Sequence, residues 1–306
     1  MEFAARVAHH PRPRGVSRLA ASMWRQAAAT PVCPATSLAG RIALVTGGSR
    51  GIGLETGRGL AERGARVVSC ARSEPAGPHR TARFVPLDLA DLRSVADALA
   101  RIEALLAGRR LDVVVANAGL WPTRHRLSAQ GHEIAFATNV LGHHALIRGM
   151  QRRGLLAEGA RVVVVTGDIY VLADSCTPDF RYRGARGGQQ AYCRSKLGNL
   201  WQVHELARRH PELCVVAVHP GVVASDLGGP AEGAVGVLKR ALLLSPEQGA
   251  QTPLYAATAP DLPSGCYLHN TLGRIELHPD DPAADADAAS ALWDQLERLV
   301  ADANGV

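Results

Sequence analysis

From Arg41 onward, short runs of β-branched and apolar residues alternate with longer stretches of helical periodicity. Such an alternation is typical of βαβ units, in which consecutive strands pair in parallel and helices cover both faces of the sheet. The apolar runs are continuous, as expected for strands that are buried on both sides. The chain is therefore expected to form a single doubly wound α/β domain around a parallel sheet of about seven strands.

The expected strands are residues 42–47, 65–71, 83–88, 112–119, 161–167, 214–221 and 264–268. The expected helices are residues 54–64, 92–108, 135–154, 192–210 and 245–259. Residues 168–190 break the rhythm, because they contain Pro178 and three glycines and have no clear period. A loop of this length in a compact domain is often functional, and we expect it to cross the end of the sheet where the site lies.

The charge of the chain is concentrated in its first residues. The net charge is +6 at pH 7, and the first 40 residues carry five arginines against one glutamate, a net of +4. The surplus therefore belongs to a tail and not to a groove for a phosphate backbone, which argues against nucleic acid as a partner. We expect residues 1–38 to be a basic, disordered extension and residues 39–306 to be the folded domain; whether the extension is a targeting segment or an extended start stays open.

The six cysteines form no CxxC pair and show no Cys/His ligand spacing, so neither a zinc site nor any other metal site is expected. No uninterrupted apolar run approaches about 20 residues, the length that crosses a bilayer, so no transmembrane segment is expected either. Cysteines without a pairing pattern suit a reducing compartment, and we expect a cytoplasmic protein.

A glycine-rich segment, Thr46–Gly53 (TGGSRGIG), joins the first expected strand to the helix that follows. Gly47 lets the strand turn tightly, Gly51 lets the backbone approach a pyrophosphate, and Gly53 allows close packing of the helix. The helix N-terminus then faces the phosphates. This context predicts the dinucleotide-binding turn of a Rossmann fold. The expected ligands in the turn are Gly47, Ser49, Arg50, Gly51, Ile52 and Gly53.

The end of the second strand indicates which dinucleotide is bound. An acidic residue there would accept a hydrogen bond from the ribose 2′-hydroxyl of NAD(H), whereas an arginine would pair with a 2′-phosphate. The strand ends Cys70-Ala71-Arg72-Ser73 without a carboxylate, and Arg50 projects toward the same region. NADP(H) is therefore favoured over NAD(H), with Arg72 and Arg50 as its ligands.

Four motifs, TGGSRGIG, Asn117-Ala118-Gly119, Tyr192-x-x-x-Lys196 and Pro220-Gly221, resemble those of short-chain dehydrogenases/reductases in order and spacing. The resemblance covers about residues 41–300. The segments AYCRSKLGNLWQVHELARR, DLADLRSV, HPGVV and SPEQGAQT are similar to the retinol-dehydrogenase-like branch, whose members act on lipophilic alcohols and carbonyls. The resemblance implies an oxidoreductase that interconverts a carbonyl and an alcohol on a lipophilic small molecule, and a homo-oligomer.

The resemblance also assigns cofactor contacts beyond the glycine turn. Asp88 and Leu89 would contact the adenine, and residues 117–119 would border the adenosine side. Val223 and Ser225 would hold the carboxamide. The further cofactor residues implied in this way are Asp88, Leu89, Asn117, Ala118, Gly119, Tyr192, Lys196, Pro220, Gly221, Val223 and Ser225.

Tyr192 is the expected proton donor and acceptor. A phenol titrates near 10 when unperturbed, so it needs a nearby cation, and a residue four positions along a helix lies on the same face. Lys196 meets this requirement and is one of only two lysines in the chain. In the family pattern the lysine connects through water to an asparagine, which would be Asn139. Asparagine is unfavourable within a helix, which supports a specific role.

The serine of the family pattern is absent. The fifth strand of the branch ends Val-Ser-Ser, and the second serine binds the substrate oxygen; here the same place reads Val165-Thr166-Gly167. Thr166 would point to the opposite face of the strand, and Asp168 would set a carboxylate near a developing oxyanion. A local bend, Ser175 from the loop, or water beside Gly167 remain alternatives. Losing one oxyanion donor typically lowers the rate by about 10² to 10³, which leaves a slow enzyme.

The missing serine keeps two other functions open: a dinucleotide-binding regulator without turnover, and a tailoring enzyme of redox-neutral or non-redox chemistry on the same fold. The substrate is expected at the carboxyl ends of the strands, bounded by residues 120–127, 168–190 and 224–245. Apolar residues there favour a bulky lipophilic carbonyl compound, although they equally suit a satellite core or a partner surface. These residues are Trp121, Tyr170, Phe180, Tyr182 and Leu227.

Overall fold

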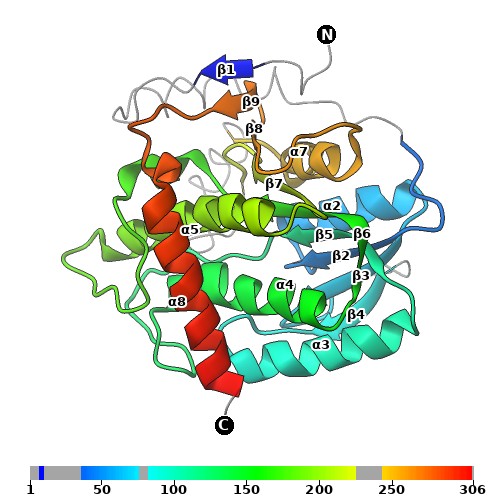
Figure 1. Ribbon diagram of the computed structural model, residues 1–306, viewed down its shortest axis with the longest axis horizontal. Helices are drawn as coiled ribbons and strands as arrows, with labels where there is room; N and C mark the ends of the chain where they lie inside the picture. Colours follow the sequence, from blue (N-terminus) through cyan, green and yellow to red (C-terminus); the bar gives the residue numbers. More distant parts are fainter. Residues whose placement is uncertain (1–6, 10–35, 76–81, 225–242, 305–306) are drawn as a thin grey trace, which may run out of the picture.

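The computed structural model describes residues 7–9, 36–75, 82–224 and 243–304, which form a nine-stranded sheet with helices on both faces (Figure 1). The strands are β1 (Val7–His9), β2 (Ile42–Thr46), β3 (Arg66–Ala71), β4 (Ala82–Pro86), β5 (Leu111–Ala116), β6 (Leu156–Val165), β7 (Cys214–His219), β8 (Tyr267–His269) and β9 (Gly273–Glu276). The helices are α2 (Gly51–Glu62), α3 (Leu92–Leu106), α4 (Gly142–Arg152), α5 (Gly187–Arg209), α7 (Pro246–Thr258) and α8 (Ala286–Asn304). Short helices are the π-helix η2 (Phe136–Leu141) and the 3-10 helices η3 (Asp168–Leu172) and η4 (Pro282–Ala284).

The strands lie in the order β1-β9-β8-β7-β6-β5-β2-β3-β4. Strands β2 to β8 coincide with the seven expected from the sequence and pair in parallel, which confirms the doubly wound α/β fold. Along the chain, the strands are added outward from β2 through β3 to β4. The next strand, β5, then pairs with the opposite edge of β2. The crevice at the carboxyl ends of β2 and β5 is therefore the topological switch point, where open α/β sheets bind their ligands.

Continuous apolar runs in the strands are explained by two cores, one on each face of the sheet. In β2, Ala43 and Val45 belong to the core under α2 and α7, whereas Ile42 and Leu44 belong to the core under α3, α4 and α5. Both faces therefore need apolar side chains, as buried parallel strands do. Helix α8 crosses the outside of α5 and α4 at the carboxyl end of the described chain (Figure 1).

The sheet has two strands more than expected, and both lie at one edge. Strand β9 runs antiparallel to β8, and β1 pairs in parallel with β9. They contain four and three residues, too few to give a periodic apolar signal. Val7–His9 lie within the segment 1–38 that was expected to be disordered, so these three residues form an ordered edge strand instead.

Two helical features also differ from the expectation. Helix α8 was not expected, although Ala289, Leu292, Trp293, Leu296 and Val300 are buried and recur at helical spacing. The stretch expected as one helix over 135–154 is divided, because η2 is a π-helix and α4 begins only after it. A π-turn inside a helix is rare and often lies at a functional site.

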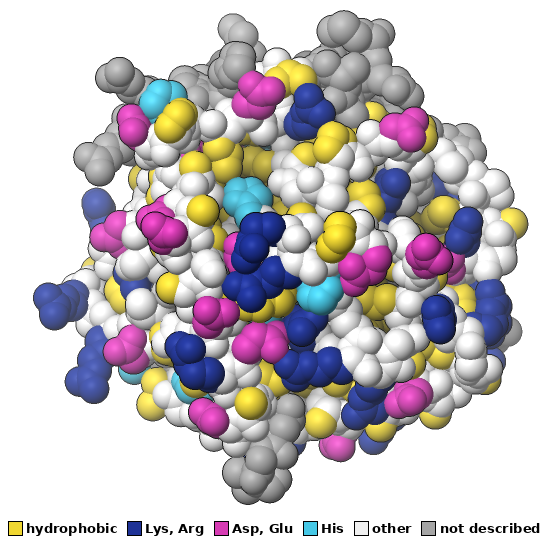
Figure 2. Space-filling view, in the orientation of Figure 1, with side chains coloured by type: hydrophobic (Ala, Val, Ile, Leu, Met, Phe, Trp, Pro, Cys, Tyr) yellow, Lys and Arg dark blue, Asp and Glu magenta, His cyan; other side chains and the backbone are white. Residues whose placement is uncertain are grey.

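Two features of the structure concern the partners expected from the sequence: the distribution of charge on the surface and the hydropathy of the helices. On the face shown in Figure 2, the basic and acidic side chains of the described residues are interspersed. A groove for a phosphate backbone would instead gather one sign of charge. Within residues 7–9, 36–75, 82–224 and 243–304, no helix has both the length and the hydropathy needed to cross a membrane.

Candidate active site

A cleft of about 1100 Å³ opens at the carboxyl ends of β2 to β7. It gathers predicted residues from six strand ends and from α5. Those that line it are Gly47, Ser49, Arg50, Gly51, Ile52, Gly53, Arg72, Asp88, Leu89, Asn117, Ala118, Gly119, Thr166, Gly167, Asp168, Tyr192, Lys196, Pro220, Gly221 and Val223. Asn139 is fully buried and does not line the cleft, and Ser225 lies outside the described residues.

The glycine-rich turn has the shape of an anion site. No side chain caps the N-terminus of α2, and its first turn contains no acidic residue. Gly51 has a φ of +58°, and a Cβ added there would meet no described atom within 4 Å, so its backbone borders open space. A Cβ at Gly53 would lie 2.4 Å from Asn117 Nδ2, a contact that only glycine avoids. An uncapped helix N-terminus beside bare backbone fits the pyrophosphate of a dinucleotide.

The end of the cleft beside β3 and β4 has two exposed arginines, Arg50 and Arg72, and no carboxylate at the end of β3. Asp88 follows β4, and its Oδ1 accepts a hydrogen bond of 2.9 Å from the amide of Ala90. Asp88 does not cap α3, because the N-cap is Asp91. The Asp88 carboxylate therefore shapes the turn that follows β4 and lines the cleft.

Thr46 ties the glycine turn to the strand end that carries Asn117. Its Oγ1 accepts hydrogen bonds of 3.0 Å from the amides of Asn117 and Ala118, and its carbonyl accepts one of 2.9 Å from Asn117 Nδ2. The ends of β2 and β5 are thereby held at a fixed separation. This contact gives the Asn117-Ala118-Gly119 motif a structural role in addition to its position on the cleft wall.

Tyr192 and Lys196 lie one turn apart on α5 and face the cleft together. Lys196 Nζ lies 5.4 Å from the centroid of the Tyr192 ring and donates a hydrogen bond of 2.9 Å to Val165 O. Burial lowers the pKa of Lys196 to about 8. Burial also raises the pKa of Tyr192, with Cys193 as a secondary cause. The phenol is thus protonated over the neutral pH range.

Trp121 packs against the ring of Tyr192. The two rings are stacked, with centroids 4.6 Å apart and an angle of 14° between their planes. Trp121 also lines the cleft, as the sequence predicted for the wall that begins at Leu120. The indole and the phenol ring therefore lie together on the wall of the cleft.

Asn139 acts from behind the cleft wall. Its Oδ1 accepts from the amide of Leu120 at 2.9 Å, and its Nδ2 lies 3.0 Å from Leu120 O and 2.9 Å from Ser195 Oγ. Ser195 in turn donates to Tyr192 O at 2.8 Å. The side chain of Asn139 thus joins the end of β5 to the turn of α5 that carries Tyr192. It is placed to position the catalytic helix.

A buried histidine, His143, extends this network and was not singled out from the sequence. Thr46 Oγ1 already accepts two amide hydrogens, so its own hydrogen donates to His143 Nε2 at 2.9 Å. His143 Nδ1 then carries the ring proton and donates to Asn139 O at 3.2 Å. Burial lowers the pKa of His143 to about 4, so the ring is neutral. The side chain of His143 therefore connects the π-helix η2 to Thr46, at the start of the glycine-rich turn.

Comparison with known proteins gives the family. A family model described as short chain dehydrogenase matches residues 41–178. Retinol dehydrogenase 14 of Mus musculus is 34% identical over 294 residues, which cover 85% of this chain and 86% of that protein. Polyprenol dehydrogenase of Mus musculus is 33% identical over 293 residues, covering 87% and 85%. The chain belongs to the short-chain dehydrogenase family.

A solved structure supports the same conclusion: the short chain dehydrogenase from Burkholderia cenocepacia J2315 in complex with NADP has a TM-score of 0.57 and 25% sequence identity, covering 78% of this chain and 99% of that chain. The relatives named retinol dehydrogenase confirm the expected retinol-dehydrogenase-like branch. The protein is a short-chain dehydrogenase/reductase.

None of the substitutes considered from the sequence points its polar group into the space beside Gly167, where the sequence comparison had led us to expect a missing serine. Thr166 Oγ1 donates to Lys196 O at 2.9 Å. Ser175 donates to Asp174 and does not line the cleft. The two oxygens of Asp168 accept hydrogen bonds from Tyr267 OH at 2.5 Å and His269 Nε2 at 3.1 Å. A Cβ added at Gly167 would instead have His219 Nδ1 as its one described neighbour within 4 Å, at 3.7 Å.

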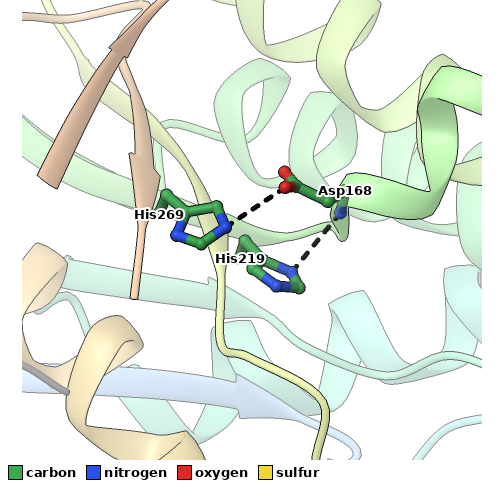
Figure 3. Close-up of side chains that lie close together, drawn as sticks. All are labelled: Asp168, His219 and His269. Carbon is green, nitrogen blue, oxygen red and sulfur yellow. Dashed lines mark hydrogen bonds and ion pairs between the residues drawn. The ribbon is translucent and has the colours of Figure 1, made fainter. Parts of the chain in front are cut away.

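Three buried side chains from β7, β8 and the start of η3 meet beside Gly167 (Figure 3). Asp168 points its carboxylate toward His269, while its backbone amide donates to His219 Nδ1 at 3.4 Å. The His219 and His269 rings lie 4.7 Å apart. Burial opposes ionisation of Asp168, but the hydrogen bonds from His269 and Tyr267 and the nearness of His219 hold its pKa well below the usual range. The carboxylate is charged and already paired.

These three residues are also the one group, within the part of the chain that the structure describes, whose ligating atoms come together as a metal would require, within 4.8 Å of one another. A metal on His269 Nε2 would need the ring proton to sit on Nδ1. His269 Nδ1, however, accepts a hydrogen bond of 3.1 Å from the amide of Thr271. The proton therefore sits on Nε2 and points at Asp168, so the geometry favours a hydrogen-bonded pair over a metal site.

The loop over residues 168–190 contributes less to the cleft than expected. Phe180 and Tyr182 do not line it, and Tyr170 is fully buried with its hydroxyl donating to Asp281 at 2.9 Å. Tyr182 donates a hydrogen bond of 2.6 Å to the buried carboxylate of Glu133. This contact holds the loop against the segment that contains Glu133. Leu227 lies outside the described residues. Of the four predicted wall residues that the structure describes, only Trp121 lines the cleft.

Proposed function

We propose that this short-chain dehydrogenase is an NADP(H)-dependent oxidoreductase that interconverts a carbonyl and an alcohol on a lipophilic small molecule. The observation that carries the proposal is the position of Tyr192 and Lys196, which share one face of α5 in the cleft that also contains the anion-binding turn. A bound nicotinamide supplies or accepts the hydride. Tyr192 then gives a proton to the substrate oxygen, or takes one from it.

The electrostatics of the site support the reducing direction. Because burial raises the pKa of Tyr192, its hydroxyl is protonated and can donate when charge develops on the carbonyl oxygen. Lys196 is the nearest cation, and its charge favours the phenolate that remains after the proton has left. Asn139 is proposed as a positioning residue, because its amide holds the turn of α5 that carries Tyr192.

The preference for NADP(H) rests on charge at the adenosine end. Arg50 and Arg72 are exposed on the cleft rim, where a 2′-phosphate would reach them, and β3 ends without the carboxylate that NAD(H) would use. The similar Burkholderia cenocepacia structure is a complex with NADP. The predicted adenine contacts, Asp88 and Leu89, and the carboxamide contact Val223 remain part of this proposal, as does Ser225.

A lipophilic substrate is supported by the apolar side chains on the wall of the same cleft, which include Leu120, Ile169 and Trp121, the last stacked on the Tyr192 ring. The similar relatives are named for retinol and for polyprenol, both long apolar alcohols. A cytoplasmic location is proposed from the cysteines, since those of the described residues are free thiols. A homo-oligomer is proposed from the family resemblance, and sedimentation velocity would measure it.

The test begins with titrations of the purified protein with NADPH and NADH, followed by fluorescence, and continues with NADPH consumption on lipophilic aldehydes, ketones and quinones. We expect tight NADPH binding and turnover on part of the panel. Tyr192→Phe removes only the proton-carrying oxygen, so turnover should disappear while the NADPH dissociation constant changes less than about threefold. Binding without turnover would support a dinucleotide-binding regulator, and products formed without net NADPH consumption would support redox-neutral chemistry.

A further inference from the structure

Two loop segments beside the cleft carry arginines and no acidic residue. The segments are residues 120–127 and 180–190, and neither contains Asp or Glu. Their five arginines are exposed, and among the described residues none of the five guanidinium groups has an ion pair or a hydrogen bond. These arginines are Arg124, Arg126, Arg181, Arg183 and Arg186. Their charges can therefore bind or attract an anion.

Contacts between the two segments bring these charges together. The rings of His125 and Tyr182 meet edge to face, with centroids 5.0 Å apart. Gly188, at the start of α5, lies against the carbonyl of Pro122, so closely that an added Cβ would collide with it. The loop that leads into α5, at the left of Figure 1, thus adds its three arginines to the two of residues 120–127.

The first of the two segments also forms part of the cleft wall. Trp121 stacks on the ring of Tyr192, and Arg126 lines the same cleft. Five residues of extended chain span at most about 17 Å, so the backbone of Arg126 lies within that distance of Trp121. Among the described arginines that line the cleft, Arg126 is the one that the proposed cofactor contacts do not use. The wall therefore carries a further cation, at a distance from Tyr192 that a long substrate can span.

We propose that the substrate is an amphipathic carbonyl compound with a carboxylate or phosphate group at the end remote from the reacting carbon, and that Arg126 binds this group. A guanidinium presents paired N–H donors that match either oxyanion. The other four arginines raise the local concentration of an anionic substrate at the mouth of the cleft. The apolar part of the substrate lies along Leu120 and Trp121, and the hydride and proton steps are unchanged. This inference rests on the proposed function, because it specifies the substrate class of the same site.

The experiment uses the full chain and matched pairs of lipophilic aldehydes and ketones, each as a terminal carboxylic acid and as its methyl ester. For the wild type, kcat/KM should be about tenfold or more higher for the acid, the usual effect of a charge-assisted hydrogen bond. Arg126→Gln should abolish this preference by raising the KM of the acid about tenfold, while the ester reports whether the rest of the site is intact. Arg101→Gln, at an exposed arginine of α3 outside the cleft, is the matched control and should keep the preference.

A second comparison concerns the arginines of the loop before α5. Arg181→Gln, Arg183→Gln and Arg186→Gln, combined in one variant, should lower kcat/KM for the acid about threefold at low ionic strength. The loss should disappear at high salt, because salt screens exposed charges. The ester should show no such dependence on salt.

The possible outcomes separate this inference from the proposed function. A wild type that reduces the esters as well as the acids would overturn the inference and leave the proposed function intact, as would an Arg126→Gln variant that loses NADPH affinity instead of the acid preference. Equal kinetics on acid and ester, together with arginine-dependent sedimentation with phosphatidylglycerol vesicles but not with phosphatidylcholine vesicles, would assign the arginines to a membrane surface instead. A wild type that binds NADPH but reduces neither member of any pair would overturn both.

Discussion

The charge of Lys196 is buried, so its effect on the free energy of unfolding can be predicted and measured. The side chain is 3% exposed, and burial lowers its pKa from 10.5 to about 8. One pKa unit corresponds to about 1.4 kcal/mol, so at pH 7 the buried ammonium makes the folded state about 3 kcal/mol less stable. Lys196→Met removes this cost but leaves Val165 O without its donor, a loss of about 1–2 kcal/mol. The variant is therefore expected to be about 1–2 kcal/mol more stable at pH 7.

The pH dependence separates charge from packing. Below pH 8 both states of the wild type hold the lysine proton, and the full cost applies. Between pH 8 and 10.5 the unfolded chain holds a proton that the folded chain lacks, so the stability of the wild type rises with pH. Lys196→Met has no such group. The stability difference between variant and wild type should therefore shrink, and then reverse, by a total of about 2 kcal/mol from pH 7 to pH 10.

Urea unfolding of the dinucleotide-free protein at pH 7, 8, 9 and 10, followed by tryptophan fluorescence and circular dichroism, measures this change. Lys196→Arg is the matched control, because the guanidinium stays charged throughout this range. As the pH rises, the stability of the wild type relative to Lys196→Arg should increase by the same amount as its stability relative to Lys196→Met. A stability difference that stays constant from pH 7 to 10 would show that the lysine is not held with a lowered pKa, and the argument from burial would be wrong.

Three further outcomes are expected. Arg72→Ala should weaken NADPH binding about tenfold and NADH binding hardly at all, because only NADPH has a 2′-phosphate; equal losses in both titrations would remove Arg72 from cofactor choice. Trp121→Ala should raise the KM of bulky apolar substrates more than that of small ones, since the indole lines the cleft against the Tyr192 ring; unchanged KM ratios would contradict this. Tyr182→Phe should lower the free energy of unfolding by about 1–3 kcal/mol, because Glu133 is buried and loses a donor; urea unfolding measures it.

The sequence was most informative where the structure depends on local spacing. The strands β2 to β8 follow from continuous apolar runs, and Tyr192 and Lys196 share a face because four residues make about one helical turn. The glycine turn could be placed because it joins a strand directly to a helix. Short edge strands such as β9 could not, since four residues carry too little periodic signal.

Contacts between distant segments were not predictable in the same way. His219 and His269 come from β7 and β8 and meet Asp168 only because three strands end at one edge of the sheet. Their separations along the chain follow no fixed spacing, unlike a helical pair. The role of Asn139 also required the structure, because the π-turn buries its side chain among backbone groups instead of aiming it at the cleft.

The surroundings of Gly167 are organised around the buried carboxylate of Asp168. A buried carboxylate is unfavourable unless hydrogen-bond donors satisfy it. At Asp168 both donors are present, and one of them, His269, is restricted to the required tautomer by Thr271. The side chain of Asp168 is therefore held in one orientation, and its backbone amide donates a hydrogen bond to His219.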